Sequence, residues 1–228
     1  MIPLYHDFAG ESVLVFGGGA VGARKASRFA DEARVVVVSP AFADRLVDLA
    51  GERGREVALV RAAPDADAVR GWVERLDPAL VIAATDDGAV NAAAEAAALD
   101  AGLLINRTDV SAADRADRDG GRDVRSVVVP ATVEDDPVTV ALSTGGASPA
   151  LAKALRERVE ADIDGAGAMA ELSGTLRAEL RERDVAPEAR REAIRHVVRS
   201  ERVWKGLQKG RSYGRQEADS VIEEVLNR

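Results

Sequence analysis

Three glycines, Gly17, Gly19 and Gly22, form the pattern G-x-G-x-x-G and are the residues whose spacing most directly suggests chemistry. They stand between an apolar run at residues 13–16 and a stretch of helical composition at 22–32. A strand, a glycine turn and a helix in this order can bind a diphosphate, because glycine lets the backbone approach the phosphates and the helix N-terminus presents free N–H groups. The pattern predicts a nucleotide site, although glycines in this spacing also form plain turns.

Polar side chains follow two later apolar runs and could line the same site. They are Thr85, Asp86, Asn106 and Asp109. In a sheet of parallel strands a ligand lies beyond the carboxyl ends of the strands, which is where we expect these residues. Each could instead cap a helix, and for Asp87 we favour the cap.

The segment after the second predicted strand reads Ser39, Pro40, Ala41 and lacks the Asp or Glu that usually holds the ribose hydroxyls of a dinucleotide. Either the cofactor prediction is weakened, or the ribose is held mainly through backbone groups. The residues leave the choice between NAD and NADP open.

A second helix start with hydroxyl groups lies further along the chain. Ser148 precedes Pro149, which predicts a helix with serine as its N-cap and proline in its first turn. The residues ahead of this start are Ser143, Thr144, Gly145 and Gly146. Their hydroxyl and backbone N–H groups could form a second anion site.

Alternating strands and helices place the glycine turn within a larger sheet. Apolar and β-branched runs predict strands at residues 13–16, 34–38, 56–61 and 102–106, and another that begins at residue 80. Helical composition lies between them, at residues 22–32, 43–53, around 72–75 and at 91–101. This alternation predicts an α/β fold of Rossmann type with a doubly wound parallel sheet.

The chain changes character after residue 110. Residues 110–123 are rich in charge and contain glycine, so we expect a surface loop there, with a substrate lid as the alternative. Strands are predicted at 126–131 and 138–143, joined by residues 132–137 in a hairpin. An isolated hairpin with exposed edges is only marginally stable, so we expect it to pair with a second copy of the chain in a homodimer.

The remaining residues predict a small helical domain. Helices are expected at residues 150–163, 169–183, 187–199 and 216–226, with a loop at 206–214. The chain then divides into a dinucleotide-binding domain at residues 1–110, a β dimerisation segment with the charged insertion at 111–148, and a helical domain at 149–228.

Composition argues against several classes of function. The net charge of −8 argues against nucleic acid as the main partner. The chain has no cysteine, which excludes disulfides, thiolate metal sites and cysteine catalysis, and we predict no metal site. No apolar run could span a bilayer and the first residues lack the features of a secretion signal, so we expect a cytoplasmic protein with no membrane partner.

Four segments together resemble the precorrin-2 dehydrogenase family of sirohaem biosynthesis. They are PLYHDFAGESVLVFGGGAVGARKA, AATDDGAVN, INRTD and VVVPATVEDDPVTVALSTGGASPALAKALRE, in this order. The resemblance covers roughly residues 1–160, and STGGASPALAK is its most specific part. It implies an NAD-binding domain, a dimerisation segment and a helical domain.

The same resemblance implies that precorrin-2 loses a hydride and a proton to give sirohydrochlorin and NADH. Some members of the family also insert Fe²⁺ into sirohydrochlorin, so a bifunctional enzyme with ferrochelatase activity is an alternative. Asp109 occupies the place of the catalytic aspartate of the family. One ionised carboxylate could accept a proton in the dehydrogenation and strip pyrrole N–H groups for metal insertion.

The resemblance also implies the positions of the ligands. It implies that Gly17, Gly19, Ala20, Val21 and Gly22 bind the diphosphate and that Pro40 and Ala41 lie by the adenosine ribose. Thr85, Asp86 and Asn106 are also predicted to bind the cofactor, because they stand at strand ends. Precorrin-2 carries eight carboxylates. Its predicted partners are the residues of the anion site at 143–146 and five cations that lie near strand ends or helix starts, Arg24, Lys25, Arg107, Arg125 and Lys153. Each of these cations could equally be an ordinary surface charge. The chain departs from the family at Arg107 and Thr108, where two apolar residues are usual.

Two other functions compete with this interpretation. A non-enzymatic NAD-sensing Rossmann module, like those that gate potassium uptake, also has a glycine turn, but such modules generally keep the acidic residue after the second strand and lack the STGGASP segment. An NADP-dependent reductase of a small carbonyl compound would need a Tyr/Lys or His/acid pair near the nicotinamide, and Tyr5 and Tyr213 lie in the wrong segments.

Overall fold

The computed structural model describes residues 2–110, 123–145 and 147–227 and divides into two compact units. Unit 1 comprises Met1–Val129 with Gly145–Ala147, and unit 2 comprises Pro130–Thr144 with Ser148–Arg228. The three-part division at residues 110 and 148 stays a prediction. The charged insertion predicted at 110–123 lies almost entirely outside the described residues. Among the described helices, none has the length and apolar character needed to cross a membrane.

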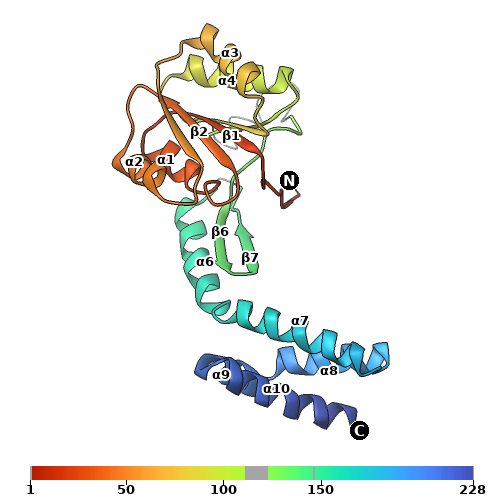
Figure 1. Ribbon diagram of the computed structural model, residues 1–228. Helices are drawn as coiled ribbons and strands as arrows, with labels where there is room; N and C mark the ends of the chain where they lie inside the picture. Colours follow the sequence, from red (N-terminus) through yellow and green to blue (C-terminus); the bar gives the residue numbers. More distant parts are fainter. Residues whose placement is uncertain (1, 111–122, 146, 228) are drawn as a thin grey trace. The chain divides into compact units, whose positions relative to one another are not determined.

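Unit 1 is built on a parallel sheet of five strands, which confirms the predicted fold class (Figure 1). The strands lie side by side in the order β3-β2-β1-β4-β5. Their bounds are Ser12–Phe16 for β1, Arg34–Ser39 for β2, Val57–Arg61 for β3, Leu80–Ala83 for β4 and Leu104–Arg107 for β5. The strand order reverses beside β1, and a crevice for ligands is expected at this point in open α/β sheets.

Helices cover both faces of this sheet (Figure 1). The helices are α1 (Ala20–Ala26), α2 (Asp44–Gly51), α3 (Ala66–Leu76) and α4 (Gly88–Asp100). Alternate residues of β1 point to opposite sides: Val13 and Val15 pack with α1 and α2, whereas Leu14 and Phe16 pack with α3 and α4. Strands buried on both faces explain the unbroken apolar runs in the sequence.

The strand register brings the site segments to one edge of the sheet. Phe16 at the end of β1 is the register partner of Val38 on one side and of Ala83 on the other. Ala83 in turn is the partner of Arg107 at the end of β5. The glycine turn and the segments after β2, β4 and β5 therefore all leave the sheet at its carboxyl edge.

Unit 2 begins with an antiparallel hairpin of β6 (Ala131–Asp135) and β7 (Val138–Leu142). The prediction of a strand at 126–131 was wrong, because the hairpin strand starts where that run ends. Residues 125–127 instead hydrogen-bond to Ile105 in unit 1, through Ile105 N–H to the Arg125 carbonyl and Val127 N–H to the Ile105 carbonyl. A β-branched run does not reveal which neighbour it pairs with.

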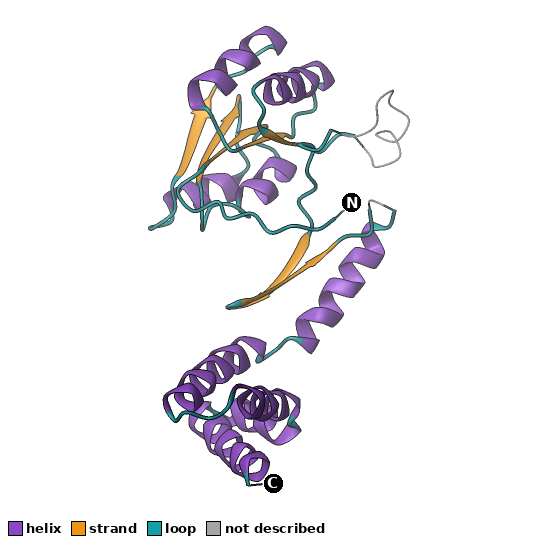
Figure 2. Ribbon diagram, turned by 90° about the vertical axis from the view of Figure 1, so that its right-hand side faces the viewer, coloured by secondary structure: helices purple, strands orange, loops and turns teal. Residues whose placement is uncertain are grey.

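Five helices follow in the described part of unit 2 (Figure 2). They are α6 (Pro149–Asp162), α7 (Ala166–Glu182), α8 (Pro187–Arg199), α9 (Glu201–Lys209) and α10 (Arg211–Leu226). The Ser148 side chain accepts from the Leu151 N–H at the start of α6, which confirms the predicted N-cap.

The loop predicted at 206–214 was wrong, since α9 and α10 occupy it and only Gly210, at φ +139°, interrupts them. The glycines serve packing rather than flexibility. A Cβ built on Gly206 would lie 3.0 Å from the Cα of Gly214, so the two helices approach closely because neither position carries a side chain.

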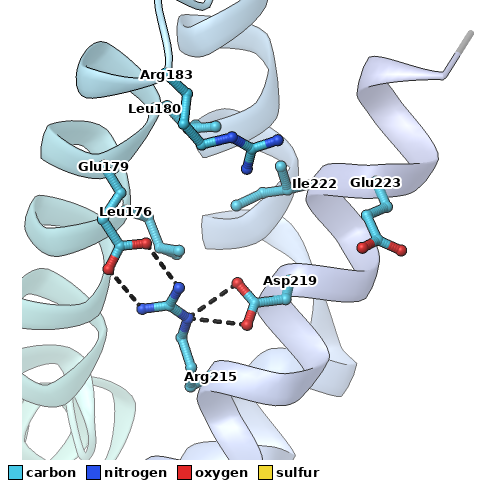
Figure 3. A pocket seen from close by; sticks show the side chains of 8 residues that line it. All are labelled: Leu176, Glu179, Leu180, Arg183, Arg215, Asp219, Ile222 and Glu223. Atoms are coloured by element: carbon cyan, nitrogen blue, oxygen red, sulfur yellow. Dashed lines mark hydrogen bonds and ion pairs between the residues drawn. The ribbon is translucent and has the colours of Figure 1, made fainter.

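An ion-pair cluster ties α10 to α7 beside the apolar core of unit 2. Arg215 donates to both carboxylate oxygens of Glu179, at 2.8 and 2.6 Å, and its Nε donates to Asp219 at 2.9 Å. Figure 3 shows the guanidinium between the two carboxylates, at a pocket with a volume of about 230 Å³ whose apolar wall includes Leu176 and Ile222. The charge of Arg215 is thus paired with Glu179 and Asp219, and we interpret these ion pairs as part of the packing between α7 and α10.

Candidate active site

Two glycines of the turn after β1 are required by the protein itself. Gly17 has φ +112°, a conformation that side chains with a Cβ rarely adopt, and a Cβ there would clash with the Ala84 carbonyl. A Cβ on Gly22 would clash with the Gly17 carbonyl, so α1 packs against β1 only with glycine at this position. These glycines are explained by the turn and by the contact of helix and strand.

Gly19 is different, because nothing in the protein lies within 4 Å of a Cβ built on it. It is the N-cap of α1, where it has no side chain to bond the free N–H groups of the first turn. Ala20 and Val21 follow it on exposed first-turn positions. The protein leaves this helix start open, as the approach of an anion requires.

The segment after β2 packs against the glycine turn. A Cβ on Gly18 would clash with the Ala41 carbonyl, and the Ala43 N–H donates to the Gly18 carbonyl at 2.8 Å. Arg61, at the end of β3, donates to the Pro40 carbonyl at 3.0 Å, and its guanidinium lies 5.6 Å from the centroid of the Phe42 ring. Backbone groups and the Arg61 guanidinium therefore lie at the segment after β2, where dinucleotide-binding proteins usually have an Asp or Glu for the ribose hydroxyls.

The turn after β4 is organised by a residue that sequence reasoning did not single out. Asn91 of α4 is fully buried and accepts from the Thr85 hydroxyl at 2.7 Å and from the Thr85 N–H at 3.1 Å. Asp87 accepts from two N–H groups of the first turn of α4, which confirms its role as a cap. Thr85 is thus held at the carboxyl edge, while Asp86 is exposed beside it.

Asn106 presents an unpaired acceptor at the end of β5. Its Nδ2 donates to the Val127 carbonyl at 2.8 Å, and its Oδ1 is, among the described residues, the one buried side-chain oxygen or nitrogen that has no hydrogen-bond partner. A buried acceptor without a partner costs on the order of 1–3 kcal/mol. Together with open Gly19, it is an observation that fits a dinucleotide at this edge.

Asp109 lies just beyond β5 and is held by Arg107, which is itself held by Glu95. Arg107 donates to its two oxygens through Nε at 3.0 Å and Nη2 at 2.6 Å, and through Nη1 to Glu95 of α4 at 3.0 Å. The side chains of Arg107, Glu95 and Asp109 are 8%, 18% and 28% exposed. A carboxylate that solvent still reaches is thereby fixed at the edge of the sheet.

The cluster determines the protonation of Asp109. The hydrogen bonds from Arg107 hold the pKa of Asp109 below its usual range, against the opposing effect of burial, and hydrogen bonding by Asn91 adds to the lowering. The same contacts raise the pKa of Arg107. Asp109 is therefore an ionised carboxylate at neutral pH and can accept a proton or a hydrogen bond.

The other predicted substrate-binding residues of unit 1 lie on other segments of the chain than Asp109. Arg24 and Lys25 lie in the last turn of α1, and Lys25 donates to the Val129 carbonyl at 3.4 Å. Arg125 Nη1 lies 4.0 Å from Asp123 Oδ1. Arg107 is engaged by Asp109 and Glu95 rather than turned to a ligand.

The predicted anion site of residues 143–146 has only partly described geometry. The Thr144 hydroxyl donates to the Ser148 carbonyl at 3.2 Å, which ties it to the start of α6. Gly146 lies outside the described residues. Lys153 is exposed on α6, and its Nζ lies 3.9 Å from Glu157 Oε1. The role of these residues stays a prediction.

Sequence reasoning missed three residues that shape the site: Glu95, Asn91 and Arg61. Glu95 and Asn91 stand one turn apart on the same helix, and that spacing was visible in the sequence. Their connection to β5 and β4 depends on tertiary contacts. Nor do the described residues contain a cluster of His, Cys, Asp or Glu suited to hold a metal ion.

Comparisons with known proteins agree with this geometry. A family model described as NAD(P)-binding matches residues 4–115, and a model described as sirohaem biosynthesis protein central matches residues 135–161. The solved structure of SirC, precorrin-2 dehydrogenase, has a TM-score of 0.65 at 21% identity and covers 98% of this chain and 100% of that chain. At this identity it shows a shared fold.

Two curated relatives bear on the family. The siroheme synthase of Methylococcus capsulatus is 35% identical over 193 residues, which are 83% of this chain and 36% of that protein. The chain spans about a third of the length of the siroheme synthases that it matches. The precorrin-2 dehydrogenase of Methanosarcina barkeri is 30% identical over 230 residues, which are 99% of this chain and 95% of that protein. Since this match extends over nearly the whole of both chains, the chain belongs to the precorrin-2 dehydrogenase family.

Proposed function

We propose that this chain is an NAD-dependent dehydrogenase that oxidises precorrin-2 to sirohydrochlorin. Family membership supports the substrate and the reaction. The observation that carries the proposal is the place of Asp109, an ionised carboxylate at the same edge of the sheet as the glycine turn. β5 is the second strand from β1 in the sheet, so the two strands that lead to the turn and to the carboxylate lie roughly 10 Å apart.

Each group has one task in this proposal. The cofactor supplies, when bound, a nicotinamide carbon that accepts hydride. Gly19 and the start of α1 bind the diphosphate through backbone N–H groups, and Asn106 Oδ1 can accept a hydrogen bond from the cofactor. Asp109 accepts the proton that precorrin-2 releases as the hydride leaves, so that two electrons and two hydrogens are removed in total.

NAD is the cofactor that the family resemblance implies, and we propose it as the natural one. The site itself shows no carboxylate among residues 39–41 that would select the ribose 2′-hydroxyl. Ribose binding then depends on backbone groups of this segment, which the contact with Gly18 holds in place.

Precorrin-2 and a second copy of the chain are the proposed partners. Arg24, Lys25, Arg125 and Lys153 remain candidates to bind the substrate carboxylates, whereas Arg107 is not included because its donors face Asp109 and Glu95. Within the described part of the chain, β6 and β7 form a sheet of two strands, and such a sheet gains stability when another strand pairs with its edge. We propose that this pairing forms a homodimer.

One assay separates the candidate functions. Purified protein is supplied with precorrin-2 and NAD, and the absorbance of sirohydrochlorin and NADH is followed before and after Fe²⁺ is added as a second substrate. Formation of both products supports the dehydrogenase, and sirohaem formed after Fe²⁺ supports the bifunctional alternative. Tight binding of NAD without turnover would overturn the proposal in favour of an NAD-sensing module.

A further inference from the structure

Three charged side chains from two elements meet beyond the end of β5. Arg107, the last residue of β5, is among the few buried charged or polar residues of the described chain, with 8% of its side chain exposed. Each of the three guanidinium nitrogens, Nε, Nη1 and Nη2, donates to a carboxylate. Two of these bonds go to Asp109 and one goes to Glu95.

This arrangement restrains Asp109 in a way that a single bond would not. Two parallel N–H donors fix the plane of the carboxylate as well as its position. The guanidinium is itself held from the opposite side by Glu95, which α4 places at the edge of the sheet. The Asp109 carboxylate is therefore positioned by a group that is anchored independently of it.

We propose that Arg107, anchored by Glu95, is a positioning residue that holds the proton acceptor Asp109 in one orientation and keeps a positive charge against it. The inference rests on the proposed function, in which Asp109 receives the proton. Arg107 itself touches neither substrate nor cofactor in this proposal, and acts through Asp109.

The charges that face Asp109 give the pH dependence. Arg107 faces it from its own strand and Asn91 faces it from α4, while Glu95 of α4 accepts from Arg107 Nη1. If Arg107 loses its charge, a partly buried carboxylate is left without its cationic partner, and burial then disfavours its ionisation. The pKa of Asp109 then rises, and a larger share of the enzyme is protonated and inactive under mildly acidic conditions.

The test compares Arg107→Met with Arg107→Lys in the full chain. For the wild type we expect kcat to stay constant between about pH 5 and 8. In Arg107→Met we expect kcat to fall toward pH 5, and we expect the acid limb of the pH profile, which is this fall in kcat, to have its midpoint at least about one pH unit higher than in the wild type. Arg107→Lys keeps the charge but not the planar fork, so we expect it to retain the wild-type acid limb with kcat lowered about tenfold and KM little changed.

Arg70→Met is the matched control. Arg70 also donates to an aspartate, Asp100, at 2.6 Å, but this pair is exposed and joins α3 to α4. Its loss should leave the acid limb and kcat unchanged. A similar displacement of the acid limb in Arg70→Met would show a general charge effect and would overturn the inference.

A readout without turnover keeps this inference separate from the proposed function. The carboxyl carbon of Asp109, assigned by its loss in Asp109→Asn, is titrated by ¹³C NMR in protein labelled at aspartate. A higher titration midpoint in Arg107→Met supports the inference, and identical midpoints in wild type and Arg107→Met overturn it. Full dehydrogenation by Asp109→Asn would instead overturn the catalytic assignment of Asp109.

Discussion

Arg107 donates through Nε and Nη2 to the two carboxylate oxygens of Asp109, which lies two residues further along the chain. Sequence reasoning assigned these residues to different tasks, the arginine to the substrate and the aspartate to the chemistry. The structure joins them in one group, and the properties of the aspartate follow from that connection.

The pair makes stability depend on pH with a definite sign. Because Arg107 lowers the pKa of Asp109 in the folded protein, the stabilisation is present above the unfolded pKa and is lost as pH falls through the folded pKa. We expect Asp109→Asn to lower the free energy of unfolding by about 1–3 kcal/mol at pH 7. Urea unfolding at decreasing pH measures this difference, which should shrink toward pH 3. A difference that grows at low pH would contradict the pairing.

Gly19→Ala should affect the cofactor and not the fold. A Cβ at this position meets nothing in the protein, but it enters the space that the diphosphate would use. We expect the Kd for NAD to rise about tenfold or more, with the free energy of unfolding changed by less than about 1 kcal/mol. Calorimetric titration with NAD and urea unfolding measure the two quantities.

Gly22→Ala is the matched control for this variant. Its Cβ would clash with the Gly17 carbonyl, so we expect it to lower the free energy of unfolding by at least about 2 kcal/mol. If Gly19→Ala lowered the free energy of unfolding as much as Gly22→Ala, both glycines would be required for folding rather than for binding the cofactor.

The ribose end of the site should discriminate weakly between the two nicotinamide dinucleotides. No carboxylate in residues 39–41 repels a 2′-phosphate, and the guanidinium of Arg61 lies against this segment. For the wild type we expect the Kd values of NAD and NADP to differ by less than about tenfold. In Ala41→Asp we expect the Kd of NADP to rise at least about tenfold more than the Kd of NAD. Titration of the wild type with both dinucleotides measures this. A wild type that binds NADP a hundredfold more weakly would contradict it.

The tip of the hairpin in unit 2 depends on one glycine of α7. The Gly167 N–H donates to Asp135 at 3.0 Å, and a Cβ on Gly167 would clash with the Asp136 carbonyl. We expect Gly167→Ala to lower the free energy of unfolding of this unit by at least about 2 kcal/mol.

Gly174 in the same helix provides the comparison, because a Cβ there meets nothing within 4 Å. Gly174→Ala should stabilise α7 by up to about 1 kcal/mol, as expected when alanine replaces glycine inside a helix. Thermal unfolding of both variants measures the contrast, and equal effects would show that the hairpin does not contact α7 as described.

The elements of unit 1 could be predicted because each has a local signal. β-branched runs mark the buried strands, and the glycine turn and the cap at Asp87 mark how two of the helices begin. The alternation of strands with helices indicates a parallel sheet, although the order of the strands in it came from the structure. The predicted fold was therefore confirmed in its main features.

The errors lie where tertiary contacts decide the structure. Gly206 and Gly214 indicate a loop by composition, but they allow α9 and α10 to pack closely. The run at 126–131 has strand composition, and it contributes only its last residue to the hairpin. The environment of Asp109 could not be predicted either, because Glu95 reaches Arg107 only after α4 has packed against β5.

The assay of Asp109→Asn with precorrin-2 and NAD tests the central claim most directly. Asparagine keeps the size of the side chain and removes its capacity to accept a proton. We predict that the variant binds NAD with a Kd within about threefold of the wild type, while kcat for sirohydrochlorin formation falls by a factor of about 100 or more. Sirohydrochlorin formed at the wild-type rate by a folded variant would contradict the account.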